Sequence, residues 1–274
     1  MIKNIIVSTD LSARSDRAVL RAIKIANNYD AHLTILHVVD SQMPDAVATN
    51  MENIATEKIN ACISGAVEGI EYDIKIIHGH EYIDILTYAT QNKYDLIILG
   101  THRHTVNELN LTGKTIERVI QHSKIPVLIV EGRSESDYDS IIVGIDFNIH
   151  SKKSLKFVLN CFENSNFSLV HSFQTPFSAF LNDDVVRNQA FEEQRDELEN
   201  FMKQNIEDVS KYNVKQVIRE GGIKEILNEE ISATQPDLLV LGTHGRTGIS
   251  HALRGSVTES FLIDPPCDIL VIRA

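Results

Sequence analysis

The chain has 274 residues, of which 43% are hydrophobic and 23% are charged, and its formal net charge at pH 7 is -12. This length suits two domains of ordinary size, and the composition is that of a globular protein. The acidic balance argues against a broad nucleic-acid-binding surface, because neutralising phosphates needs clustered lysine and arginine.

No apolar stretch approaches the roughly 20 residues that a membrane-spanning helix needs, so we expect no membrane segment. The N-terminus has only a short apolar run broken by Asp10, which is typical of a first strand rather than a signal peptide. Three cysteines, Cys62, Cys161 and Cys267, share no motif and are interpreted as reduced thiols. Cytoplasm is therefore the expected location.

Short apolar runs alternate with longer amphipathic stretches along the first half of the chain. Runs of Ile, Val and Leu separated by helices indicate a parallel sheet covered on both faces. Right-handed crossovers then make this half a doubly wound α/β domain. The expected strands are 5–9, 33–39, 72–78, 95–100 and 126–131, and the expected helices lie near 13–28, 47–68, 82–92 and 114–122.

The second half repeats this order of elements. Segments 94–104 and 125–132 match 236–246 and 267–274 at one shared offset of 142 residues, which indicates a duplication. The polar segment 132–139 is the expected linker. We therefore predict an α/β protein of two tandem doubly wound domains, residues 1–132 and 139–274, each with a five-stranded parallel sheet of the Rossmann-like type.

One segment of the second half has the composition of a phosphate-binding loop. Ligands of open parallel sheets bind outside the carboxyl ends of the strands, and residues 242–260 follow the fourth strand with four glycines in fourteen residues. Ser256 and Glu259 have the spacing of a capping box, and the free amides of a helix start favour an anion. With Arg246 and Arg254 nearby, the segment predicts a phosphorylated ligand rather than a plain connecting loop.

At these residues the chain resembles the universal stress proteins, whose ATP-binding members carry Gly-x2-Gly-x9-Gly-Ser/Thr after the fourth strand. Gly242, Gly245, Gly255 and Ser256 match that spacing in full, and the resemblance covers essentially the whole chain as two tandem domains. It implies an adenine nucleotide alpha hydrolase-like fold and a regulatory stress-response module that binds ATP, AMP or ADP, with Mg²⁺ able to accompany the phosphates. Together with the chemistry of the segment, it gives an expected nucleotide site made of Gly144, Ile145, Asp146, Ser172, Leu241, Gly242, His244, Gly245, Arg246, Arg254, Gly255, Ser256, Val257 and Thr258.

The first half departs from this pattern. It keeps Gly100 and Gly113, but Arg103 stands at the second glycine and Lys114 at the Ser/Thr position. A side chain at position 103 would fill the space where backbone must approach a phosphate. We expect this half to bind adenine nucleotide poorly or not at all, with its cationic side chains either binding a smaller anion or reaching into solvent.

Nothing in the sequence has the pattern of a catalytic centre, and no catalytic residue is assigned. There is no G-x-S-x-G elbow and no G-x-G-x-x-G after either first strand. The alternative to a binding module is a slow ATPase or nucleotidyl-transfer enzyme in the same pocket. Such an enzyme needs a positioned base, for which His244, His251 and Asp146 are the candidates.

Other polar residues near strand ends have plainer interpretations. The His-x-His pairs at 78–80 and 102–104 lack a cysteine or acidic ligand at a familiar spacing, so no metal site is assigned. His37 and His171 recur at the second strand of each half and are interpreted as structural. Asp10, which precedes Ser12, is interpreted as a turn acid that helps to cap the first helix.

The fifth strand of each half, 126–131 and 268–274, is apolar and is expected at a sheet edge, where exposed strands invite pairing. Members of the resembled family commonly dimerise through this strand. The resemblance therefore implies an internal pseudo-dimer of the two halves and leaves a homodimer of the whole chain open. No protein partner can be named from the sequence.

Overall fold

The computed structural model of the chain describes residues 2–101, 114–132, 136–175, 184–242 and 257–273. The first half consists of β1 (Asn4–Ser8), α1 (Ala13–Tyr29), β2 (His32–Asp40), α2 (Asp45–Ile63), β3 (Tyr72–Gly79), α3 (Glu81–Gln91), β4 (Leu96–Gly100), α4 (Lys114–His122) and β5 (Val127–Val130). The second half consists of β6 (Ser140–Ile145), α5 (Ile149–Cys161), β7 (Asn166–Phe173), α6 (Asp184–Asn205), a 3-10 turn (Val209–Lys211), β8 (Asn213–Glu220), α7 (Ile223–Thr234), β9 (Leu238–Gly242), α8 (Val257–Ile263) and β10 (Asp268–Ile272).

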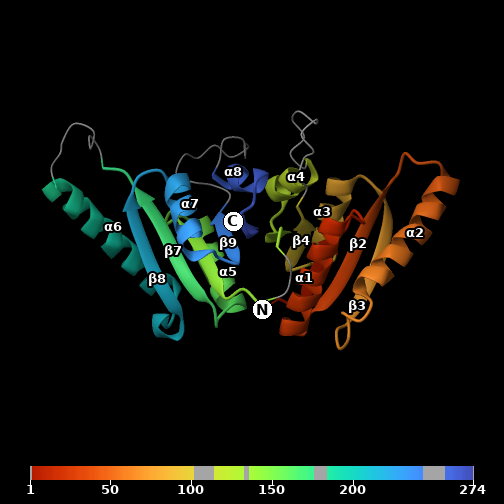
Figure 1. Ribbon diagram of the computed structural model, residues 1–274, viewed down its shortest axis with the longest axis horizontal. Coiled ribbons are helices and arrows are strands. Elements are labelled where there is room, and N and C mark those ends of the chain that lie inside the picture. The colour runs from red at the N-terminus through yellow and green to blue at the C-terminus, as the bar shows by residue number, and fades with distance from the viewer. Residues whose placement is uncertain (1, 102–113, 133–135, 176–183, 243–256, 274) are drawn as a thin grey trace.

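These strands form one ten-stranded sheet in the order β3-β2-β1-β4-β5-β10-β9-β6-β7-β8. Neighbouring strands within each half are parallel. At the centre β5 and β10 pair antiparallel, with Ile129 opposite Ile269. Figure 1 shows the two halves side by side, with α2 and α6 at opposite ends of the molecule. The predicted tandem α/β architecture is therefore confirmed.

Helices cover both faces of this sheet. One apolar layer is formed with α1, α2, α5 and α6, and the other with α3, α4, α7 and α8. Successive residues of a strand point to opposite faces, so Ile5 and Val7 pack into the first layer and Ile6 into the second. All three side chains are fully buried, which explains why the strands have near-continuous apolar sequences. In the part of the chain that the structure describes, no helix is long and apolar enough to cross a membrane.

A glycine at the end of the fourth strand lets a helix approach the sheet closely in each half. A Cβ on Gly100 would stand 2.9 Å from the carbonyl oxygen of Arg14 and 2.9 Å from Cα of Ser15, both in α1. A Cβ on Gly242 would stand 3.1 Å from Cβ of His150 in α5. The first glycine of the motif therefore serves helix–strand packing in both halves, independently of any ligand.

Replacing Gly100 with alanine is expected to lower the free energy of unfolding by about 1–3 kcal/mol, since the added methyl group meets backbone atoms that cannot rotate away. The control is Gly144→Ala at the end of β6. There the new Cβ would meet the movable Cδ2 of Leu241 at 3.3 Å, and no backbone atom nearer than 3.7 Å. Urea denaturation of both variants measures the difference. Equal stability of the two would contradict the packing role of Gly100.

A buried carboxylate joins the two halves near the centre of the sheet. Asp268 Oδ2 lies 3.3 Å from Nε of Arg21 and accepts a hydrogen bond from the Tyr138 hydroxyl at 2.6 Å. Oδ1 accepts the backbone N–H groups of Glu131 and Gly132, both at 2.9 Å. The Arg21 guanidinium also stacks over the Tyr138 ring, 4.5 Å from its centroid. We refer to these five residues as the Asp268 cluster.

Through the Asp268 cluster, one residue of the predicted linker, Tyr138, belongs to the buried core. Tyr138 is 4% exposed, although it lies within the polar segment 132–139. Burial, and after it the neighbouring Asp268 carboxylate, raise the pKa of Tyr138 well above its ordinary value. The hydroxyl therefore stays protonated and available as a donor to Asp268.

Candidate functional site

The carboxyl ends of β6, β7 and β9 and the start of α8 lie at one edge of the sheet. Because β6 pairs with β7 on one side and β9 on the other, the strand order reverses there, which is where doubly wound folds bind ligands. Thr258 Oγ1 donates to the carbonyl oxygen of Gly242 at 3.3 Å, and Gly144 faces the Leu241 side chain. The structure thus brings these four predicted site residues to one edge, together with Ile145, Asp146, Ser172 and Val257.

The remaining predicted site residues lie outside the described part of the chain. These are His244, Gly245, Arg246, Arg254, Gly255 and Ser256. Their roles at a nucleotide stay predictions. The described residues do fix where this segment leaves the fold and where it returns, because Gly242 and Thr258 are hydrogen-bonded to each other.

Asp146 has its carboxylate at the start of α5. Oδ2 accepts from the side-chain amide of Asn148 at 2.7 Å, and Oδ1 accepts from the Ser151 hydroxyl. Asn148 is in turn the N-cap of α5. In the first half, Asp10 Oδ1 accepts from the backbone N–H of Ser12, the N-cap of α1, at 3.0 Å. Both acids therefore support a helix start, and contact between Asp146 and a ligand stays a prediction.

His37 and His171 occupy equivalent places in the two halves. Nδ1 of His37 lies 2.8 Å from the carbonyl oxygen of Thr9, and Nδ1 of His171 lies 2.8 Å from that of Ile145. A carbonyl oxygen only accepts, so Nδ1 carries the proton in both rings. Both side chains are buried. Each histidine ties the second strand to the end of the first, as a structural role requires.

Sequence reasoning missed a backbone feature at the same edge. The residue after each turn acid has a left-handed conformation, with φ of 63° at Leu11 and 62° at Phe147. Residues other than glycine rarely adopt this backbone conformation, and it persists only where surrounding contacts enforce it. The Phe147 ring packs against His171 with 4.3 Å between ring centroids. No glycine marks either position in the sequence, so the usual signal was missing.

The first half has a cavity of about 220 Å³ at its own carboxyl edge, which sequence reasoning did not anticipate. Asp10 and His37 are among its lining residues. A second cavity of about 460 Å³ adjoins it, and the two share Val38, Glu81 and Thr115. The half with the altered glycine motif thus has two adjoining open cavities among its described residues.

The candidate metal ligands of the first half are only partly described. His78 contacts the carboxylate of Glu52 through Nε2. Between residues of the described ranges, no group of three His, Cys, Asp or Glu side chains is arranged to hold a metal ion. His102 and His104 lie outside those ranges, so the absence of a metal site stays a prediction.

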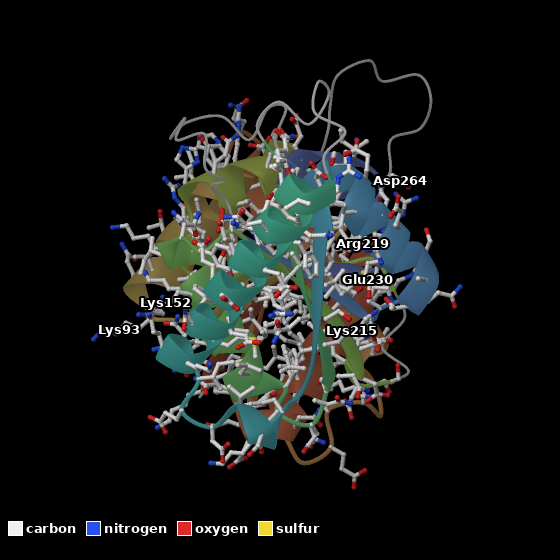
Figure 2. The ribbon with its side chains drawn as sticks, turned by 90° about the vertical axis from the view of Figure 1, so that its left-hand side faces the viewer. Lys93, Lys152, Lys215, Arg219, Glu230 and Asp264 are labelled. Atoms are coloured by element: carbon white, nitrogen blue, oxygen red, sulfur yellow. The ribbon has the colours of Figure 1, made fainter. Side chains whose placement is uncertain are left out.

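Two basic side chains, Lys215 and Arg219, lie on the outer strand β8. Figure 2 shows Lys215 and Arg219 beside Glu230 of α7. Lys215 Nζ lies 2.7 Å from Glu230 Oε1, and Arg219 Nη2 lies 3.4 Å from Oε2. Arg219 Nη1 lies 2.9 Å from Glu229. Because acidic partners neutralise both cations, this cluster is a structural ion-pair network and not a surface prepared for phosphate.

Comparison with models of protein families shows to which family the chain belongs. The model described as the universal stress protein family matches residues 1–131 and 137–273. The chain belongs to the universal stress protein family. Both halves match the same model, in agreement with the duplication seen in the sequence.

Individual universal stress proteins match either one half or the whole chain. One from Methanocaldococcus jannaschii is 30% identical over 141 residues, covering 48% of this chain and 83% of that protein. One from Mycolicibacterium smegmatis is 22% identical over 290 residues, covering 98% and 96%. The crystal structure of a universal stress protein from Archaeoglobus fulgidus superposes with a TM-score of 0.73 at 18% identity, covering 98% of each chain. The tandem fold is thus shared over the full length.

Proposed function

We propose that the chain binds ATP or a related adenine nucleotide at the carboxyl edge of its second half and acts as a regulatory stress-response binding module. The observation that carries the proposal is the hydrogen bond between Thr258 and Gly242, 3.3 Å long. Gly242 and Thr258, which flank residues 243–256 of the glycine-rich segment, are thereby held at the edge of the sheet where β6 pairs with β9. The segment has the full Gly-x2-Gly-x9-Gly-Ser spacing of ATP-binding universal stress proteins.

The rest of the proposed pocket follows from the elements at that edge. Gly144 and Leu241 would border the base, because both lie beside the point where the strand order reverses. The hydroxyl groups and amides of the glycine-rich segment would hold the phosphates, with Mg²⁺ as a companion ion. The first half, which has Arg103 and Lys114 in place of a glycine and a serine, would not hold a nucleotide in this way.

A nucleotide is expected to accompany the protein or to bind it on addition. The test is mass spectrometry of small molecules released from the denatured pure chain, followed by calorimetric titration of the stripped chain with ATP, AMP and cyclic AMP. One adenine nucleotide per chain is the expected result, with hydrogen exchange in 246–254 slowed at saturation. No released nucleotide and no saturable binding would contradict the proposal.

No described contact favours the alternative of a slow ATPase. Hydrolysis needs a base in line with the attacking water. The Asp146 carboxylate is engaged at the start of α5, and His244 and His251 lie outside the described residues. The enzyme reading therefore stays a prediction, as does a cytoplasmic location.

We further propose that the β5–β10 pair takes the place of a contact between two single-domain subunits. The two strands pair antiparallel over Val127–Ile129 and Ile269–Val271. This pairing leaves β3 and β8 as the outer strands of the sheet. A homodimer of the whole chain would then need a different surface from the fifth strands.

A further inference from the structure

The strand β3 ends the sheet on the side of the first half. Among the described residues it pairs with β2 alone, so its other edge faces outward. Figure 1 shows β3 and β8 at opposite ends of the sheet. An outer strand presents a row of backbone N–H and C=O groups that can pair with another chain. The sheet can therefore be extended at these two strands.

The hydrogen bonds to β2 show which residues of β3 have backbone groups that face outward. The carbonyl oxygen of Glu71 accepts from the backbone N–H of Leu33 at 3.0 Å. That of Gly79 accepts from the backbone N–H of Ser41 at 3.2 Å. Backbone groups alternate in direction along a strand, so the odd-numbered residues of β3 face β2. The residues whose backbone groups face outward are Tyr72, Ile74, Ile76 and His78.

The side chains of β3 are accessible and alternate between apolar and charged types. Tyr72 is 38% exposed, and Ile74 and Ile76 are half-buried on the same face of the strand. Asp73 and Lys75 point to the other face, with side chains 50% and 44% exposed and their charged groups 3.8 Å apart. The outer edge thus has an apolar row on one face and a carboxylate beside an ammonium group on the other.

One antiparallel register makes this edge complementary to itself. With a two-fold axis through Ile74, this residue forms a hydrogen-bonded pair with its copy, and Tyr72 stands opposite the partner's Ile76. Asp73 then stands opposite the partner's Lys75 in a non-hydrogen-bonded pair, in which the Cα atoms are about 4.5 Å apart. Symmetry gives this pair of opposite charges twice, and such pairs across strands are stabilising. An axis through Lys75 would instead place two ammonium groups opposite each other.

The other outer strand, β8, lacks this complementarity. At the shared offset of 142 residues, Lys215 stands where the first half has Asp73. The backbone N–H of Gly221 donates to β7 at 2.9 Å, so the backbone groups of Lys215 and Arg219 face inward and those of Glu220 face outward. Residues opposite each other in an antiparallel pair have backbone groups of the same direction. No antiparallel register of β8 with its own copy therefore brings Glu220 opposite a cation.

We propose that the outer edge of β3 is a dimerisation surface and that its partner is β3 of a second copy of this chain, paired antiparallel about Ile74. The pairing would join two ten-stranded sheets into one, as the β5–β10 pair already joins the two halves of the chain through three residue pairs. A two-fold contact uses the same surface of both copies, so the assembly stops at the dimer. The inference does not depend on nucleotide binding in the second half.

The test is the mass of the full chain in solution, measured by analytical ultracentrifugation over a dilution series. In about 0.15 M salt, the repulsion between two chains of net charge -12 is screened beyond roughly 8 Å. We expect a reversible equilibrium between monomer and dimer. A chain that stays monomeric up to about 1 mM would overturn the proposal, and so would an assembly that continues beyond the dimer.

An exchange of charges tests the register. Asp73→Lys and Lys75→Asp each place like charges opposite each other twice, and each is expected to weaken the dimer about tenfold or more. The double variant Asp73→Lys with Lys75→Asp restores opposite charges and is expected to dimerise as tightly as the original chain. Circular dichroism verifies that each variant is folded. A double variant as weakly dimeric as the single variants would overturn the proposal.

A substitution at the axis has a matched control on the other outer strand. Ile74→Lys brings two ammonium groups together and is expected to give a monomer at concentrations where the original chain is dimeric. Gln216→Lys makes the equivalent change on β8, at the offset of 142 residues, and is expected to leave the dimer unchanged. Persistence of the dimer in Ile74→Lys would overturn the proposal, and so would its loss in Gln216→Lys.

Discussion

Replacing Asp268 with alanine is expected to lower the free energy of unfolding by about 3–5 kcal/mol, the cost of breaking a buried ion pair by removing one partner. The side chains of Arg21 and Asp268 are 5% and 1% exposed, so the guanidinium would be left with a buried charge. The Tyr138 hydroxyl and two backbone N–H groups would lose their acceptor as well. Urea denaturation followed by circular dichroism measures the loss.

An exposed ion pair beside the cluster provides the control. Asp137 lies 3.5 Å from Lys24, with side chains 60% and 27% exposed. Asp137→Ala is expected to cost about 0.2–1 kcal/mol, because water and salt screen such a pair. Adding Arg21→Met to Asp268→Ala should recover part of the loss, since it removes the uncompensated charge. A loss in Asp268→Ala no larger than in Asp137→Ala would show that the Asp268 cluster does not hold the halves together.

The alternation of strands and helices could be predicted because it depends on local pattern. Apolar runs in the sequence became buried strands, and Ser12 became the N-cap of α1 with Asp10 bonded to its amide. The repeat between the halves was equally visible, because it needs only comparison of the chain with itself. These features are set by residues close together in the sequence.

The contacts that the sequence did not reveal join residues far apart in the chain or depend on backbone strain. Tyr138 and Asp268 are 130 positions apart, and nothing in the polar segment 132–139 distinguishes a buried tyrosine from a solvated one. The left-handed residues Leu11 and Phe147 have no glycine to mark them. The first-half cavity was unexpected because the prediction concerned the phosphate motif, whereas the cavity is formed by strand ends and helix starts that both halves possess.

The second large effect is expected at the glycine motif of the second half. Gly245→Arg should weaken ATP binding by about 100-fold or more, because a side chain there blocks the approach of backbone amides to phosphate. Two lost hydrogen bonds to a charged group, each about 1.5–3 kcal/mol, suffice for that factor. The first half has arginine at the equivalent position, Arg103, so the fold already accommodates this residue at one of its two copies.

The same duplication provides the controls for Gly245→Arg. Arg103→Ala changes the position of the first half that is equivalent to Gly245, and it should leave the ATP affinity unchanged. The double variant Arg103→Gly with Lys114→Ser restores the glycine and serine of the motif and should produce a second, weaker nucleotide site, seen as a stoichiometry above one. Calorimetric titration of the three variants with ATP decides the matter. Undiminished ATP affinity in Gly245→Arg would show that the nucleotide does not bind at this motif of the second half. Weaker ATP binding in Arg103→Ala would indicate a nucleotide site in the first half.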